Sequence, residues 1–172
     1  IKDNVKGVEY IAMNTDAMAL NSNNADVIVP LGNDLTRGLG AGMKPDVGCA
    51  AAEAEIEVIQ NVLENADMVF LAAGMGGGTG TGAIPVVADI AKNLNILTVA
   101  VVTTPFSFEG RRRAQIAEAG LEELRRHIDT LVIIPNTRLL ELASEKTTMN
   151  EAFTMADDVL KQAIGGITNL VN

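Results

Sequence analysis

Apolar residues in this chain recur in short runs that are separated by stretches with helical spacing. The runs cover residues 8–14, 26–31, 67–73, 95–103 and 129–135. The last three runs are nearly continuous and rich in β-branched residues, which is typical of strands buried on both faces. The stretches with helical spacing cover residues 49–64, 82–93, 108–127 and 136–143. This alternation predicts an α/β fold, Rossmann-like, with a mostly parallel sheet and helices on both faces.

The last segment, residues 149–172, carries apolar residues around well over half of a helical wheel. Such a helix needs cover on several sides, so we expect residues 151–172 to form a long central helix that ends the domain. The chain stops without a closing cap and begins abruptly before its first strand. We therefore expect a single domain over residues 1–172, cut from a longer protein at both ends, with a second domain normally following the helix.

Composition narrows the class of protein. Apolar residues make up 48% of the 172 positions, and the formal net charge is −9. An acidic chain lacks the basic face that nucleic-acid binding needs, so we expect no nucleic-acid partner. No apolar window reaches the roughly 18 residues of a membrane span, so we expect no direct membrane insertion. A single cysteine fits a reducing compartment, and we expect a cytoplasmic protein.

The single cysteine, Cys49, and the single histidine, His127, are weak candidates for chemistry. No histidine lies near Cys49 in the sequence, and a lone thiol is most often a packing residue. His127 follows two arginines near an expected helix end, where a surface position suits the helix dipole. One histidine and one cysteine also argue against a structural zinc site.

The stretch AAGMGGGTGTGAIP, residues 72–85, lies between a predicted strand and a predicted helix. In open α/β sheets, ligands bind beyond the carboxyl ends of the strands. Helix starts leave unpaired N–H groups and a partial positive charge, which bind phosphate. Thr79 and Thr81 add hydroxyl donors, and Pro85 is expected in the first turn, where its missing N–H costs little. A second glycine-rich stretch, residues 35–48, is placed to cover a terminal phosphate.

The spacing of residues around the glycine loop tests alternative roles for it. A P-loop ends in Gly-Lys-Ser/Thr, and no lysine lies between Lys44 and Lys92. The dinucleotide fingerprint fits loosely at Gly78, Gly80 and Ala83. The next strand, however, ends in VVTT without the acidic residue that this fingerprint requires. An NAD(P)-binding Rossmann domain and a tight turn without a ligand stay open as less favoured alternatives.

The loop GGGTGTG at residues 76–82 resembles the signature of the tubulin/FtsZ family of GTPases. The resemblance extends in order over nearly the whole chain, through NTDAMAL at 14–20, GLGAG at 38–42, ILTVAVVTTPFSFEGRRR at 96–113 and ADDVLKQAIGGI at 156–167. Within the family, these segments are similar to the nucleotide-binding domain of its bacterial cell-division branch.

The resemblance implies a role for individual residues. The α- and β-phosphates would be wrapped by Gly76, Gly77, Gly78, Thr79, Gly80, Thr81 and Gly82, and the nucleotide would also contact Gly74 and Met75. The γ-phosphate would lie near Gly40, Ala41 and Gly42. The phosphates and Mg²⁺ would have Asn14 and Asp16 nearby. The sugar pocket would be lined by Thr103 and Pro105. The ribose and phosphate side would be contacted by Glu109 and Arg113, which also fit an ordinary i,i+4 surface pair.

The guanine base, on the same resemblance, would contact Asn136, Phe153 and Asp158. Phe153 would stack on the base, although its helical spacing equally suits the core. Asp158 would accept from two N–H donors of the base, which would favour guanine over adenine.

The resemblance also implies what a whole protein of this kind does. It implies GTP and GDP as ligands, Mg²⁺ held mainly by the nucleotide, and head-to-tail self-association into filaments at the bacterial division site. Hydrolysis would be completed by an acidic loop of the neighbouring subunit, so we expect no catalytic residue in this chain and weak turnover by it alone. Other cell-division partners are expected through C-terminal regions beyond residue 172. The alternative is a non-hydrolysing fragment or modulator that binds GTP and caps filaments.

Overall fold

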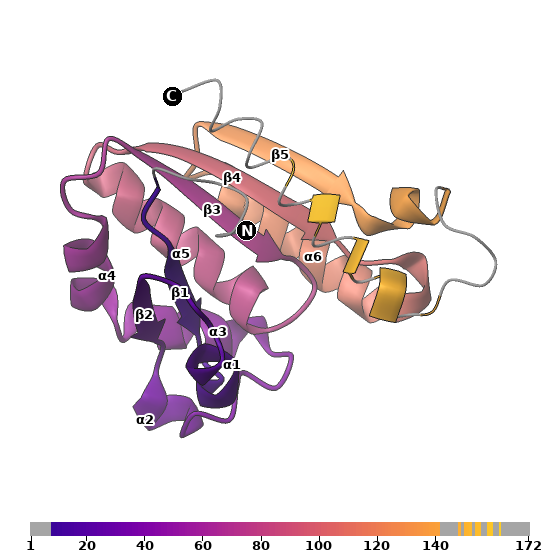
Figure 1. Ribbon diagram of the computed structural model, residues 1–172, viewed down its shortest axis with the longest axis horizontal. Helices are drawn as coiled ribbons and strands as arrows, with labels where there is room; N and C mark the ends of the chain where they lie inside the picture. The colour runs from indigo at the N-terminus through magenta and orange to yellow at the C-terminus, as the bar shows by residue number, and fades with distance from the viewer. Residues whose placement is uncertain are drawn as a thin grey trace.

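The computed structural model describes residues 8–141, 148, 150–152, 154–155, 158–159 and 162. Its strands are β1 (Ile11–Asn14), β2 (Val27–Pro30), β3 (Met68–Gly74), β4 (Leu97–Thr104) and β5 (Thr130–Pro135). Its α-helices are α1 (Ala17–Asn21), α2 (Asn33–Thr36), α3 (Pro45–Glu53), α4 (Ile56–Leu63), α5 (Thr79–Asn93) and α6 (Arg111–Arg125). Short 3₁₀ helices cover Ser107–Glu109 and Asn136–Glu141. Strands and helices alternate along the described chain (Figure 1), as the hydrophobic pattern predicts.

Every strand pair that the structure describes is parallel. β1 pairs with β2, and β3, β4 and β5 form a second sheet in that order. In this larger sheet Gly74 lies opposite Thr103, and Thr104 lies opposite Pro135. The carboxyl ends of its strands therefore meet at one edge, where ligands of α/β proteins bind. The predicted parallel α/β fold is confirmed.

Both faces of the larger sheet are buried. Ala100 and Val102 point to one face, where they pack with residues of α5 and α6. Val99 and Val101 point to the opposite face and are only 5% and 0% exposed. Burial on both faces explains why these strands read as continuous apolar runs instead of alternating ones.

The predicted helix over residues 151–172 is only partly covered by the structure. Its described residues up to 162 are helical. Among them Ala152, Met155 and Val159 pack on Phe106, which is 1% exposed. The remainder of that prediction lies outside the described residues.

A second core fills the space between β2, β3, α3, α4 and α5. Its fully buried members include Val29, Leu31, Ala51, Ala52, Ile59, Val87 and Ala91. Here α3 and α5 approach each other backbone to backbone. A Cβ built on Gly82 of α5 would collide with the carbonyl oxygen of Pro45, and one built on Gly48 of α3 would collide with the carbonyl oxygen of Gly78. Glycine at these positions is therefore a packing requirement of the α3–α5 interface.

Several predicted helix boundaries are wrong. The segment 49–64 forms two helices, because α3 starts earlier, at Pro45, and ends at Glu53 before α4 begins. α3 buries only small residues, whereas α4 buries Ile59 and Leu63. The two helices thus need different distances from α5, which one straight helix cannot provide. Ile56, an apolar residue within the predicted helix 49–64, is 38% exposed.

The segments 108–127 and 136–143 also differ from simple helices. Gly110 has φ +103°, which separates the 3₁₀ turn Ser107–Glu109 from α6, so the regular helix begins only at Arg111. The segment after β5 is a 3₁₀ helix that ends at Glu141, and residues 142 and 143 lie outside the described residues.

Pro85 lies in the second turn of α5, where the first turn was expected. The helix begins at Thr79, and the Gly82 N–H donates to the Gly78 carbonyl at 3.1 Å. Because proline has no N–H, it leaves the carbonyl of Thr81 without its usual partner four residues later.

Candidate functional site

The predicted site residues that the structure describes are grouped at the carboxyl ends of the strands. β3 leads into the glycine loop, residues 74–78, and β4 leads into Thr103 and Pro105. The loop of residues 38–42 joins the end of β1 through main-chain bonds from Gly40 N–H to the Thr15 carbonyl, 3.2 Å, and from Ala17 N–H to the Gly38 carbonyl, 3.0 Å. The two glycine-rich stretches and the end of β1 therefore form one continuous surface.

The glycine loop is held from both ends by specific hydrogen bonds. Met75 N–H donates to the Thr103 carbonyl at 2.9 Å, and Gly76 N–H donates to the buried Thr81 hydroxyl oxygen at 2.8 Å. Gly76 has φ +110°, and a Cβ there would lie 2.7 Å from Pro105 Cγ. Pro105 and Thr103 thus shape the loop from the neighbouring strand.

The amide groups beyond this point are left for a ligand. Among the residues that the structure describes, no acceptor is found for the N–H groups from Gly77 to Thr81. They surround the start of α5, a helix of 15 residues with no side-chain cap on its first turn. Converging amides and the helix dipole make this end of α5 suited to an anion such as phosphate.

The glycines of the loop serve different purposes. A Cβ on Gly78 would lie 2.8 Å from Ala41 Cβ, and one on Gly80 would lie 2.7 Å from the Gly74 carbonyl oxygen. Gly77 has nothing within 4 Å of a built Cβ. Of these three positions, only Gly77 therefore faces open space, and the others are required by packing within the protein.

The glycines of the second glycine-rich stretch also fall into two groups, those that face open space and those that packing requires. Gly40 and Gly42 have φ of +93° and +60°, and a built Cβ would meet nothing closer than Asp16 Cβ at 4.0 Å. Ala41, between them, is 7% exposed. Gly48, by contrast, lies inside α3 and packs on Gly78. The expectation that residues 35–48 cover a terminal phosphate is therefore wrong for Gly48, which is required by packing.

The polar residues after β1 are engaged in shaping the chain. The Asn14 side-chain oxygen accepts from the N–H groups of Thr15 and Asp16, at 2.8 and 3.2 Å. Asp16 caps α1, since its Oδ1 accepts from Met18 N–H at 2.9 Å and from Ala19 N–H at 3.3 Å. These bonds fix the turn that joins β1 to the 38–42 loop.

Glu109 and Arg113 form the i,i+4 ion pair that their spacing predicts, at 3.1 Å. Glu109 is 10% exposed in its side chain, and its second oxygen accepts from Phe106 N–H at 2.7 Å. The other guanidinium nitrogen of Arg113 lies 3.3 Å from Met43 Sδ, next to the 38–42 loop. The pair therefore connects the chain after β4 with the second glycine-rich stretch.

Asn136 gives an independent indication of a ligand at the end of β5. It follows β5 directly and is 6% exposed, yet its side-chain oxygen is buried without a hydrogen-bond partner among the described residues. Buried polar atoms are nearly always paired, so this oxygen suits a donor that comes from outside the chain. Asp158 is exposed, and Phe153 lies outside the described residues.

The site contains no preformed metal centre in the described part of the chain. No group of three or more His, Cys, Asp or Glu side chains in it is arranged to hold a metal ion. Residues 72–85 carry no charged side chain. The donor set is thus main-chain amides and hydroxyls, which fits a phosphate group rather than a directly bound cation.

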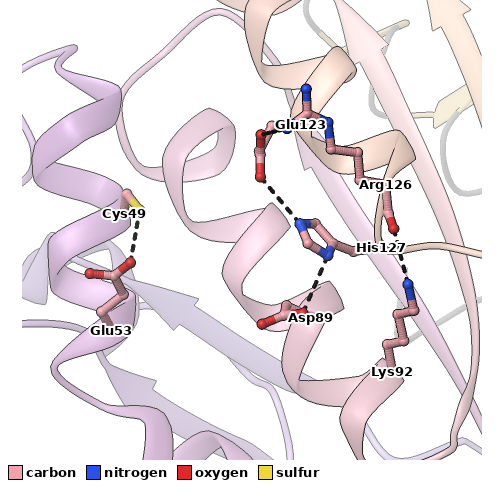
Figure 2. A network of polar contacts seen from close by, with 7 residues as sticks. All are labelled: Cys49, Glu53, Asp89, Lys92, Glu123, Arg126 and His127. Atoms are coloured by element: carbon pink, nitrogen blue, oxygen red, sulfur yellow. Dashed lines mark hydrogen bonds and ion pairs between the residues drawn. The ribbon is translucent and has the colours of Figure 1, made fainter.

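Cys49 and His127 take no part in the site. The Cys49 thiol donates to Glu53 Oε1 at 3.5 Å (Figure 2), and burial, followed by the charge of Glu53, raises the pKa of the thiol. A protonated thiol is a poor nucleophile. His127 lies between Asp89 of α5, at 3.3 Å, and Glu123 of α6, at 3.2 Å. With 21% side-chain exposure it is less open than the predicted surface position.

Thr15 is the residue that sequence reasoning missed. It is 1% exposed, and its hydroxyl oxygen lies 2.6 Å from that of Thr79 at the start of α5. It lies between Asn14 and Asp16, two residues that the resemblance did select. Its burial could not be predicted, because a polar residue at a strand end is ordinarily exposed.

Comparisons with known proteins show the family of this chain. The family described as "Tubulin/FtsZ family, GTPase domain" matches residues 2–144. The cell division protein FtsZ of Neisseria meningitidis serogroup A is 54% identical over 171 residues, which are 99% of this chain and 43% of that protein. The FtsZ of Buchnera aphidicola is 50% identical over 99% of this chain and 44% of its own length. This chain therefore spans less than half the length of these relatives.

Solved structures give the same result for the fold. The structure titled "FtsZ dimer, empty (M. jannaschii)" matches with a TM-score of 0.95 and 46% identity, over 98% of this chain and 49% of that one. CetZ1 from Haloferax volcanii, titled as a GDP-bound monomer, is 22% identical over 87% of this chain and 48% of its own, with a TM-score of 0.77, and supports the fold alone.

Proposed function

Because this chain belongs to the tubulin/FtsZ family, we propose that it binds a guanine nucleotide with the phosphates over the start of α5. The observation that carries the proposal is the row of amides from Gly77 to Thr81, for which no acceptor exists among the described residues. Hydrogen bonds from amides to a charged phosphate are stronger than hydrogen bonds between neutral groups. Several such bonds in a partly buried place would therefore bind the anion tightly.

The other site residues are assigned to the parts of the nucleotide that surround these phosphates. Gly40, Ala41 and Gly42 lie where a terminal phosphate would extend, and Thr103, Pro105, Glu109 and Arg113 line the sugar side. Asn136 supplies a buried acceptor for the base, and we assign Phe153 and Asp158 to the base as well. Mg²⁺ is held mainly by the phosphates in this proposal, with Asn14 and Asp16 nearby, and it would neutralise phosphate charge.

For the whole protein we propose GTP hydrolysis coupled to head-to-tail assembly. Support comes from relatives named as cell division protein FtsZ and from a related structure titled as a dimer. An interface between unlike surfaces of identical subunits produces a filament when its rotation does not close into a ring. The catalytic acidic group is supplied by the neighbouring subunit, outside residues 1–172. We place this assembly in the cytoplasm at the bacterial division site. In the described part of the chain, no helix has the length and apolar character to cross a membrane.

Nucleotide choice tests the proposal directly. We expect GDP at 100 times its Kd to stabilise the chain by about 2.7 kcal/mol. For a domain of this size that raises Tm by roughly 5–10 °C. ATP and NADH at the same concentration should give far smaller shifts, since adenine and nicotinamide lack the adjacent N1–H and N2–H₂ donors of guanine that Asp158 would accept. Thermal unfolding with each nucleotide in turn measures this. Equal stabilisation by GDP and ATP would remove the assignment of the base site, and stabilisation by NADH alone would favour a dinucleotide-binding domain.

A further inference from the structure

Thr15 connects the two glycine-rich stretches through buried hydrogen bonds. Its carbonyl oxygen accepts from the Thr36 hydroxyl at 3.2 Å and from Gly40 N–H at 3.2 Å. Its own hydroxyl oxygen lies 2.6 Å from that of Thr79, a residue 64 positions later. Thr15 is thus hydrogen-bonded both to the 38–42 loop and to the start of α5.

The Thr15–Thr79 hydrogen bond is compatible with either threonine as the donor, and a ligand on Thr79 would set its direction. A short contact between two hydroxyl oxygens contains one hydrogen, so one threonine donates and the other accepts. The Thr15 hydroxyl has no other polar partner among the described residues. Thr79 is half-buried and stands among the unpaired amides at the start of α5. A phosphate oxygen accepts hydrogen bonds, so a bound phosphate would make Thr79 its donor and Thr15 the donor to Thr79.

We propose that Thr15 is a positioning residue for the nucleotide, acting through Thr79. By donating to the Thr79 oxygen, the Thr15 hydroxyl aims the Thr79 hydrogen at a phosphate oxygen. Through its carbonyl, the same residue ties this arrangement to Gly40 in the loop that would reach the terminal phosphate. The inference rests on the proposed nucleotide site and names a residue that the family resemblance did not select.

The test is a set of matched variants of the 172-residue chain, titrated with GDP. Thr15→Val keeps the shape and removes the hydroxyl, and we expect the Kd to rise about tenfold, as for a hydrogen bond that supports a charged ligand. Thr15→Ser keeps the hydroxyl, and its Kd should stay within about twofold of the original. Thr15→Ala removes the hydroxyl without adding a methyl group and gives a second test if Thr15→Val does not fold.

A double-mutant cycle separates positioning from a general effect on the fold. In a Thr79→Val background the Thr15 hydroxyl has no group to orient, so Thr15→Val should change the Kd no further. An unchanged Kd for Thr15→Val in the original chain would overturn the inference and leave the nucleotide site intact. An equal loss in the Thr79→Val background would also overturn it, because Thr15 would then act through another group. Failure of the original chain to bind GDP would overturn the proposed function together with the inference.

Discussion

Replacing Gly82 with alanine is expected to destabilise the folded chain by about 3 kcal/mol or more. The added Cβ would collide with the Pro45 carbonyl oxygen and lie 2.7 Å from Cys49 N, both of them main-chain atoms of α3. A flexible side chain could move aside, but two packed helix backbones cannot. Urea unfolding followed by circular dichroism measures the loss as a lower midpoint at unchanged slope.

Gly77→Ala is the matched control for this prediction. It lies in the same loop, but a Cβ there meets nothing within 4 Å. Its unfolding free energy should therefore stay within roughly 0.5 kcal/mol of the original value. Equal destabilisation by both substitutions would mean that the close α3–α5 interface is not what requires glycine at position 82.

Introducing a carboxylate at Gly77 is expected to abolish tight nucleotide binding while the fold survives. A charge placed about 4 Å from a phosphate costs roughly 4 kcal/mol at an effective dielectric constant of 20. Gly77→Asp should therefore raise the Kd for GDP by about 100-fold or more. Gly77 has open space for a side chain, so the thermal stability of the unliganded variant should change little. Calorimetric titration with GDP gives the Kd.

Gly77→Asn provides the neutral comparison, because it has nearly the same size as Gly77→Asp and no charge. Steric crowding affects both variants, whereas repulsion affects only the carboxylate. We expect Gly77→Asn to bind at least about tenfold more tightly than Gly77→Asp, with a difference that shrinks at high salt. Identical affinities would argue that no phosphate approaches this part of the loop.

The strands could be predicted from sequence because burial on both faces requires nearly continuous apolar runs. Their parallel direction could be predicted because helical stretches alternate with these runs. The runs 67–73, 95–103 and 129–135 correspond within one or two residues to β3, β4 and β5. These runs can be recognised as strands by their apolar, β-branched composition, without knowing which strands they pair with. The position of the glycine loop at the end of β3 followed from the same pattern.

Helix boundaries were predicted less well because they depend on tertiary contacts. The break between α3 and α4 arises where the buried residues that face α5 change from small to large. The distance of each helix from α5 cannot be derived from the hydrophobic pattern of the chain. Likewise, Gly48 and Gly82 belong to glycine-rich stretches in sequence, and only the close approach of α3 and α5 shows that packing requires glycine at both positions.

The site shows the same division between local and distant information. The glycine loop is formed by consecutive residues, so its capacity to bind an anion could be predicted from residues 72–85 alone. Thr15 gains its importance from Thr79, 64 positions away, and Asn136 from burial that its neighbours in sequence do not indicate. Glu109 and Arg113 show the ordinary ion pair that spacing predicts, and their contact with a nucleotide stays a prediction.

The central claim is that the amides at the start of α5 bind the phosphates of a guanine nucleotide. Amide chemical shifts of the isotope-labelled chain during a GDP titration test it most directly. We expect the largest shifts on Gly77, Thr79 and Gly80, with smaller ones at Gly40 and Gly42. Saturating GDP that leaves the Gly77, Thr79 and Gly80 amides unmoved, or moves another part of the chain instead, would contradict it.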